Sequence, residues 1–184
     1  MTHAAYLMAL FPLGGFVVLI TLGRRLGDPW AGWIGTGAVT GSFVVACVSL
    51  AGLLSEPASA RHLSENYFSW ITVGGLQVKV GLLLDPLSMT MCMFVTGVSA
   101  LIHLYSVGYM KGDPEYPKFF VYLNLFVFSM VVLVLANNLL VTFVGWEGVG
   151  VCSYWLVAFW HRRDSAASAG KKAFIYNRIG DVGF

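Results

Sequence analysis

Charged residues are scarce in this sequence. Asp, Glu, Lys and Arg make up 11% of its 184 residues, whereas hydrophobic residues make up 58%. An average soluble domain has about 25% charged residues, and several uncharged runs here reach the roughly 18–20 residues that cross a bilayer. The composition therefore excludes an ordinary soluble domain and predicts an integral membrane protein.

Residues that bind cofactors are scarce as well. The three cysteines, Cys47, Cys92 and Cys152, lie in separate apolar runs without a CxxC pair, which argues against a disulfide framework and against an iron–sulfur site. No glycine-rich phosphate loop connects a strand to a helix, and no metal-ligand spacing occurs. We therefore expect the chain to bind no nucleotide, flavin, metal or nucleic acid.

The apolar runs predict an all-α membrane bundle with five complete transmembrane helices and the start of a sixth. The expected ranges are about 4–22, 30–54, 82–110 (beginning at Leu82 or near Pro86), 119–136, 139–160 and from 166 onward. The first run carries its positive charge after the apolar stretch, which favours an uncleaved span over a signal peptide. Alternating apolar residues on both sides of Gly74-Gly75 predict a short β-hairpin between the second and third spans.

The basic residues are distributed unevenly between the two sides of this predicted topology. One side has only Arg61 and Lys79. The other side has eight basic residues: Arg24, Arg25, Lys111, Lys118, Arg162, Arg163, Lys171 and Lys172. Because cytoplasmic loops carry an excess of Lys and Arg, we place the loops at Arg24, Lys111 and Arg162 in the cytoplasm. The N-terminus and the hairpin are then outside, in a multi-pass protein of the cell (inner) membrane.

Glu147 is the one charged residue in the run 139–160 and lies near its centre. An ionisable group at membrane depth costs roughly 2.5 kcal/mol or more, and such groups usually face the bundle interior or a hydrated path. A basic partner that approaches or leaves would change how readily this carboxyl holds a proton. Glu147 is therefore a candidate proton carrier; the alternative is a purely structural hydrogen-bonded carboxyl. No lysine lies in the apolar core of a complete predicted span.

A few other polar residues lie within the predicted spans. Arg178 and Asp181 are three residues apart on one helix face and can form a local ion pair, which either anchors the helix or modulates a nearby proton site. His103 is either a packed neutral side chain or a proton relay. We expect Asn124 to form an interhelical hydrogen bond and Asp85 to cap the third span.

Five segments that carry these residues resemble one known family. In chain order they are 84–88 (LDPLS), 101–106 (LIHLYS), 119–126 (FFVYLNLF), 145–154 (GWEGVGVCSY) and 173–181 (AFIYNRIGD). Together they resemble the N-terminal third of subunit L (chain 5) of proton-translocating NADH–quinone oxidoreductase, respiratory complex I. The segment from 145 onward is specific to subunit L rather than to its sister subunits M and N. The large subunits of multisubunit sodium/proton antiporters are related, and such an antiporter is the alternative.

The resemblance implies an organisation and a site. Members of this family contain inverted helix repeats with broken helices. Residues 1–65 would form N-terminal transmembrane helices, 66–118 the chain 5 N-terminal segment, and 119–184 the start of the antiporter-like core. The family's glutamate at the position of Glu147 pairs with a lysine of the seventh helix in a proton-handling site, and the residues matching Arg178 and Asp181 lie near it. Because the sequence stops within the sixth predicted span, we expect an N-terminal fragment of a longer protein.

The resemblance also implies a function for the whole complex. Electrons pass from NADH to quinone through FMN and iron–sulfur clusters held by other subunits, and a subunit of this family couples that transfer to proton translocation. Its partners would be subunit M and other membrane-arm subunits, the lipid bilayer and protons.

Overall fold

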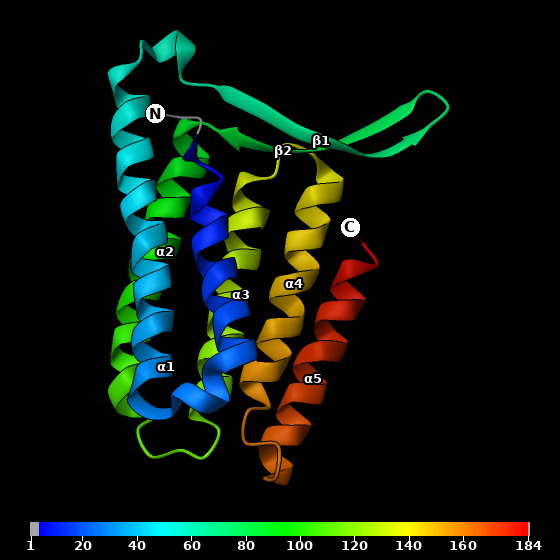
Figure 1. Cartoon of the computed structure of the whole chain (residues 1–184). Coiled ribbons are helices and arrows are strands. Elements are labelled where there is room, and N and C mark those ends of the chain that lie inside the picture. The colour runs from blue at the N-terminus through cyan, green and yellow to red at the C-terminus, as the bar shows by residue number, and fades with distance from the viewer. Residues whose placement is uncertain (1–3, 184) are drawn as a thin grey trace.

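Helices lie side by side in this protein, and a two-stranded hairpin crosses one end of them (Figure 1). The computed structural model describes residues 4–183. The elements are α1 (Leu7–Ser55), a short 3₁₀ turn (Ala58–Ala60), β1 (Leu63–Val73), β2 (Leu76–Leu84), α2 (Pro86–Tyr109), α3 (Tyr116–Leu135), α4 (Leu139–Val157) and α5 (Asp164–Asp181).

Helix α1 turns back on itself. Gly27 and Asp28 have non-helical backbone angles, and Gly27 has a φ of 62°, which a glycine adopts without a steric cost. The two arms, 7–26 and 29–55, lie antiparallel (Figure 1), and the Ser42 hydroxyl donates to the Met8 carbonyl at 2.6 Å between them. The turn therefore lies between the two predicted ranges 4–22 and 30–54.

Four helices of the described chain are long and apolar enough to cross a membrane, namely α1 to α4. This finding confirms a multi-pass helical protein with a hairpin. It does not establish the predicted count of five complete spans and the start of a sixth. Helix α1 counts as one element, and α5, which carries five charged residues in its 18, is not among the four.

Two helices begin at the polar caps that their sequences provide. The Asp85 carboxylate accepts from the Ser88 backbone N–H at 2.7 Å, and the Ser88 hydroxyl accepts from the Asp85 N–H at 3.0 Å. This reciprocal pair satisfies two N–H groups that the helix leaves unpaired, and it confirms the predicted cap. Helix α4 begins with a single cap hydrogen bond, in which the Asn138 side chain accepts from the Val141 N–H at 3.1 Å.

The predicted hairpin is confirmed and is longer than the alternation indicated. Strands β1 and β2 pair antiparallel around Gly74 and Gly75, with two irregularities of register. The hairpin is tied to the bundle where α3 passes into α4: the Asn137 amide donates to the Asn66 side chain at 2.8 Å, and the Asn138 amide donates to the Lys79 carbonyl at 2.7 Å. Its far end projects beyond α4 (Figure 1).

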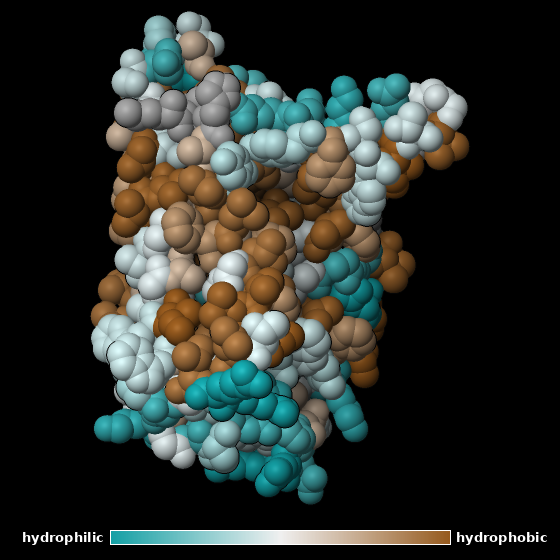
Figure 2. Space-filling model, in the orientation of Figure 1, coloured by the Kyte–Doolittle hydropathy of each residue, from teal (hydrophilic) through white to brown (hydrophobic). Residues whose placement is uncertain are grey.

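Apolar side chains form both the core and much of the surface. One buried cluster lies towards the hairpin and includes Met89, Val131 and Leu135; a second lies towards the opposite end and includes Tyr116 and Phe120. Figure 2 shows hydrophobic residues over much of the middle of the face in view, between hydrophilic ends. This arrangement fits a lipid-facing surface. The loops between α2 and α3 and between α4 and α5 lie at the end opposite the hairpin (Figure 1).

We predict that Gly145→Ala destabilises the contact between α3 and α4. A Cβ at Gly145 would lie 2.6 Å from the backbone nitrogen of Leu133, and overpacking of this kind typically costs about 1–3 kcal/mol. Thermal unfolding of the purified protein in detergent measures the loss. Gly37→Ala is the matched control, because a Cβ there meets nothing within 4 Å. Equal stability of the two variants would contradict the predicted clash.

Candidate functional site

Glu147 lies in the middle of α4, as the ninth of its 19 residues. With a rise of about 1.5 Å per residue, its Cα is about 12 Å along the axis from the start of the helix. The side chain is 24% exposed within the described chain. The carboxylate is therefore far from both ends of an apolar helix.

The partner of Glu147 is Arg178 on the neighbouring helix α5. The Arg178 Nη1 forms an ion pair with Glu147 Oε2. On the other side of the same guanidinium, Nε lies 3.3 Å from Asp181 Oδ2, so the ion pair predicted from the three-residue spacing is present. One guanidinium is thus shared between two carboxylates, which leaves one net negative charge when all three groups are ionised.

Trp146 completes the arrangement. Its indole N–H donates to Asp181 Oδ1 at 2.6 Å. Consecutive residues of α4 therefore bind two residues of α5 that are one turn apart. We call these four side chains, Trp146, Glu147, Arg178 and Asp181, the Glu147 network. Asp181 is the most enclosed of the charged members, with 9% of its side chain exposed.

Glycines next to Glu147 let the neighbouring helices approach α4. A Cβ at Gly148 would lie 2.5 Å from the Ser129 Oγ of α3, and a Cβ at Gly150 would lie 3.4 Å from the Arg178 Nη2 of α5. At these two positions the absence of a side chain therefore permits close contact between the helices. Gly150 follows Glu147 by three residues and leaves room for the guanidinium on the same helix face.

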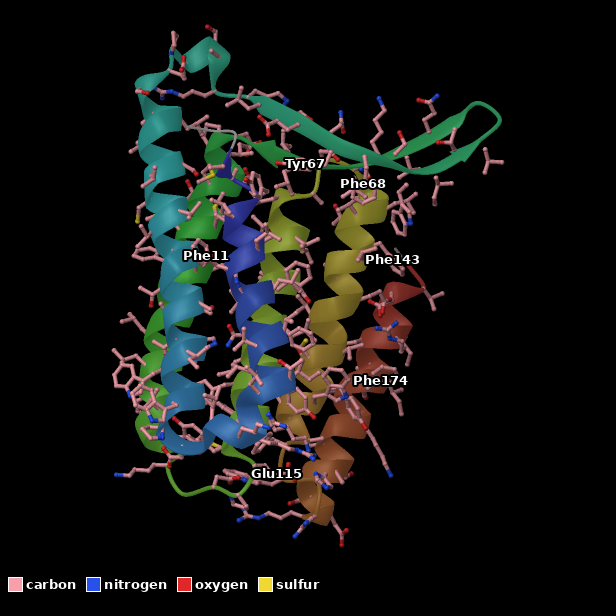
Figure 3. All side chains as sticks on the ribbon, viewed as in Figure 1. Phe11, Tyr67, Phe68, Glu115, Phe143 and Phe174 are labelled. Atoms are coloured by element: carbon pink, nitrogen blue, oxygen red, sulfur yellow. The ribbon has the colours of Figure 1, made fainter. Side chains whose placement is uncertain are left out.

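The guanidinium also contacts an aromatic ring. The Arg178 Cζ lies 5.1 Å from the centre of the Phe174 ring, within the range of a cation–π interaction. Phe174 is labelled on α5 in Figure 3. The Phe174 ring in turn packs against Tyr154 of α4, with ring centres 5.5 Å apart. The Nε and Nη2 atoms of Arg178 and the Oδ2 atom of Asp181 are buried without a hydrogen-bond partner. The network therefore retains a donor that a further acceptor can use.

His103 and Asn124 lie in a different part of the bundle, between α2 and α3. His103 Nδ1 is 2.8 Å from the Ser99 carbonyl oxygen, and Asn124 Nδ2 is 3.4 Å from His103 Nε2 and 2.9 Å from the Phe120 carbonyl oxygen. Since a carbonyl only accepts, Nδ1 carries a hydrogen and Nε2 accepts from the amide, which is the neutral form of the ring. The expected interhelical contact of Asn124 is confirmed. Neither His103 partner belongs to the Glu147 network.

Two family models match this chain. Residues 70–120 match the model described as NADH-ubiquinone oxidoreductase (complex I), chain 5 N-terminus, and residues 136–184 match NADH:quinone oxidoreductase/Mrp antiporter, TM. The second match contains the whole Glu147 network. Among curated proteins, NADH-quinone oxidoreductase subunit L of Mycobacterium tuberculosis (strain CDC 1551 / Oshkosh) is 47% identical over 182 residues, 99% of this chain and 29% of that protein. The chain belongs to the subunit L family.

Other members of the family match over almost the same stretch. Subunit L of Escherichia coli (strain K12) is 41% identical over 96% of this chain and 28% of its own length. NADH-ubiquinone oxidoreductase chain 5 of Allomyces macrogynus is 42% identical over 94% of this chain and 27% of its own length. The chain thus spans less than a third of the length of these relatives.

A solved structure shares the fold. A chain of the membrane-bound sulfane sulfur reductase, an archaeal respiratory membrane complex, superposes with a TM-score of 0.82 at 17% identity, over 99% of this chain and 35% of that chain. At this identity the likeness concerns the fold alone.

Among residues 4–183 no three His, Cys, Asp or Glu side chains gather as a metal site requires.

We predict that Glu147 and Arg178 are energetically coupled. Glu147→Gln and Arg178→Gln should each destabilise the protein, because each leaves a charge without its partner. The double variant should be less destabilised than the sum of the two, with a coupling energy of about 1–3 kcal/mol. Thermal unfolding of the four proteins in detergent gives this value. Strict additivity would contradict an ion pair in the folded protein.

Proposed function

We propose that this chain belongs to a proton-translocating membrane-arm subunit of NADH-quinone oxidoreductase and that Glu147 is its proton carrier. The observation that carries the proposal is a mid-helix carboxylate that shares one guanidinium with a second carboxylate. The 47% identity of this chain to a subunit L also supports the proposal. A charge inside a membrane bundle is costly and typically marks an ion or proton path.

In this mechanism Arg178 sets the protonation of Glu147 without carrying the proton itself, because a guanidinium remains charged in proteins. A positive neighbour favours the ionised carboxylate. When Arg178 lies against Glu147, the carboxyl releases its proton; when Arg178 moves towards Asp181, Glu147 takes one up. The motion required is small, since the guanidinium already contacts both acids.

The remaining negative charge of the network provides a place for a further basic group. The resemblance implies a lysine on a seventh helix as the partner of the glutamate, and such a lysine would make the four charges neutral overall. Arg178 would then pass between Asp181 and Glu147 as the lysine approaches or leaves. This step would link proton loading in this part of the subunit to movement elsewhere in it.

The rest of the complex supplies the redox chemistry in this proposal. Electrons would pass from NADH through FMN and iron–sulfur clusters to quinone in other subunits, and this chain would hold no redox centre. Subunit M and its neighbours would be its partners. The two arms of α1, helices α2 to α4 and the start of a sixth span at α5 would cross the cell membrane. The hairpin and N-terminus would lie outside and the basic loops in the cytoplasm.

The second candidate is a subunit of a cation/proton antiporter without redox partners. It is favoured by one observation, the match of residues 136–184 to a model shared by NADH:quinone oxidoreductase and Mrp antiporter proteins. Neighbouring genes that encode flavin and iron–sulfur subunits would favour the first candidate. Sodium-driven proton exchange by vesicles that lack NADH oxidation would favour the second.

We predict that Glu147→Gln leaves the complex assembled but reduces proton pumping at least tenfold. The amide keeps the size of the side chain but cannot take up or release a proton. Dye quenching in membrane vesicles energised with NADH measures pumping, and native gels measure assembly. Glu115→Gln is the matched control, because this glutamate lies at the basic end of the bundle, paired with Lys118 at 2.7 Å. Normal pumping by assembled Glu147→Gln would refute the assigned role.

We further predict that His103→Gln retains proton pumping within about twofold of the unchanged protein. Both ring nitrogens are engaged, one by the Ser99 carbonyl and one by the Asn124 amide. This arrangement supports a packing role over the alternative of a relay. The same vesicle assay, corrected for the amount of assembled complex, decides the point. Loss of pumping in an assembled variant would restore His103 as a relay candidate.

A further inference from the structure

The two oxygens of Asp181 have different partners: Oδ1 accepts a hydrogen bond, whereas Oδ2 has an ion-pair contact without a hydrogen bond. Trp146 of α4 donates to Oδ1 at 2.6 Å, and Arg178 of α5 lies 3.3 Å from Oδ2. The carboxylate is 9% exposed, whereas the Trp146 side chain lies at the outer face of the helix pair, 47% exposed. The indole therefore both covers the acid and fixes its orientation.

A hydrogen bond to a carboxylate is stronger than one between neutral groups, and it satisfies part of the charge that the acid would otherwise direct at its cation. Without the indole N–H, Arg178 would be the main partner of Asp181 and would be drawn towards it. The ion pair between Arg178 and Glu147 would then be weaker. Glu147 and Asp181 compete for Arg178. Trp146 directly precedes Glu147 in α4 and binds Asp181, so one turn of α4 influences the position of both acids.

We propose that Trp146 is a positioning residue of the proposed proton site: its N–H holds Asp181 and thereby sets how Arg178 is divided between Asp181 and Glu147. This inference rests on the proposed function for its physiological meaning. The division of Arg178 itself can be measured without proton pumping.

Polar groups outside the network lie close to it. Within residues 4–183, the ion pairs of the network join its own Glu147, Arg178 and Asp181. The groups near it on the packed helices include Ser129 of α3, Cys152 of α4 beside Ser129, Tyr154 of α4 against Phe174, and Asn177 of α5 near Gly150. The contacts of the network connect Trp146 to Glu147 through Asp181 and Arg178.

The test is the titration of the Glu147 carboxyl in the complete, membrane-embedded complex, followed by the infrared C=O band of its protonated form. The band is assigned by its absence in Glu147→Gln. In Trp146→Phe, which keeps an aromatic ring but loses the N–H, we expect the midpoint of this titration to rise by about 0.5–1 pH unit. The pH profile of pumping should move in the same direction.

Two further variants distinguish positioning from general damage. Trp155→Phe is the matched control, because it removes the same N–H from the same helix at a ring that stacks on Tyr122, with centres 5.1 Å apart; it should leave the midpoint unchanged. Asp181→Asn should lower the midpoint, because Arg178 is then left to Glu147. In the Asp181→Asn background, Trp146→Phe should cause no further shift.

An unchanged or lowered midpoint in Trp146→Phe would overturn the inference, and so would an equal rise in the Asp181→Asn background. If Trp146→Phe does not assemble, the opposite shift expected for Asp181→Asn still tests how Arg178 is divided, and its absence would overturn the inference. The proposed function fails by a different result, normal pumping in Glu147→Gln, whatever the titration shows.

Discussion

The arrangement around Glu147 depends on one positive charge placed between two negative charges inside an apolar bundle. A single buried carboxylate would be very unfavourable at this depth, and a closed pair of one acid and one base would be fixed in place. When two acids share Arg178, the guanidinium can pair mainly with Glu147 or mainly with Asp181, and the same three charges are present in both cases. A site of this kind keeps its charges in the bundle and still leaves them able to exchange partners.

The packing around this arrangement follows from residue size. Gly145 and Gly148 bring α3 close to α4, and Gly150 makes room for Arg178 from α5. Larger residues at these positions would separate the helices and break the contacts between consecutive residues of α4 and the residues of α5. Small residues are therefore as necessary to the site as the charged ones, since without close packing a membrane helix has little to hold it against its neighbour.

Much of the fold could be predicted from the sequence because lipid permits few backbone structures. Long apolar runs can only be helices, and the alternation around Gly74-Gly75 indicated the hairpin. The site could be predicted in part: the spacing of Arg178 and Asp181 gave their ion pair. Trp146 was missed as a site residue, because a tryptophan in an apolar run has no pattern that reveals its partner. Contacts between helices depend on their relative rotation, which hydropathy does not determine. The family resemblance implied that Arg178 and Asp181 lie near the site of Glu147, but no pattern in the sequence indicated the direct contact between Arg178 and Glu147.

The hairpin has a consequence for where the bilayer lies. In the described part of the chain, strands β1 and β2 form a sheet of only two strands, so the outer edge of each strand has backbone groups without a partner strand, and Lys79 of β2 is exposed. Because lipid does not accommodate open sheet edges, the hairpin belongs at the water interface. Asn138 joins Lys79 of this hairpin to the first turn of α4. Glu147 is the ninth residue of α4, so its distance along the helix axis from Asn138 is fixed. The hairpin thus acts as a reference level for the membrane surface, and it sets the depth at which the acidic group meets the lipid interior.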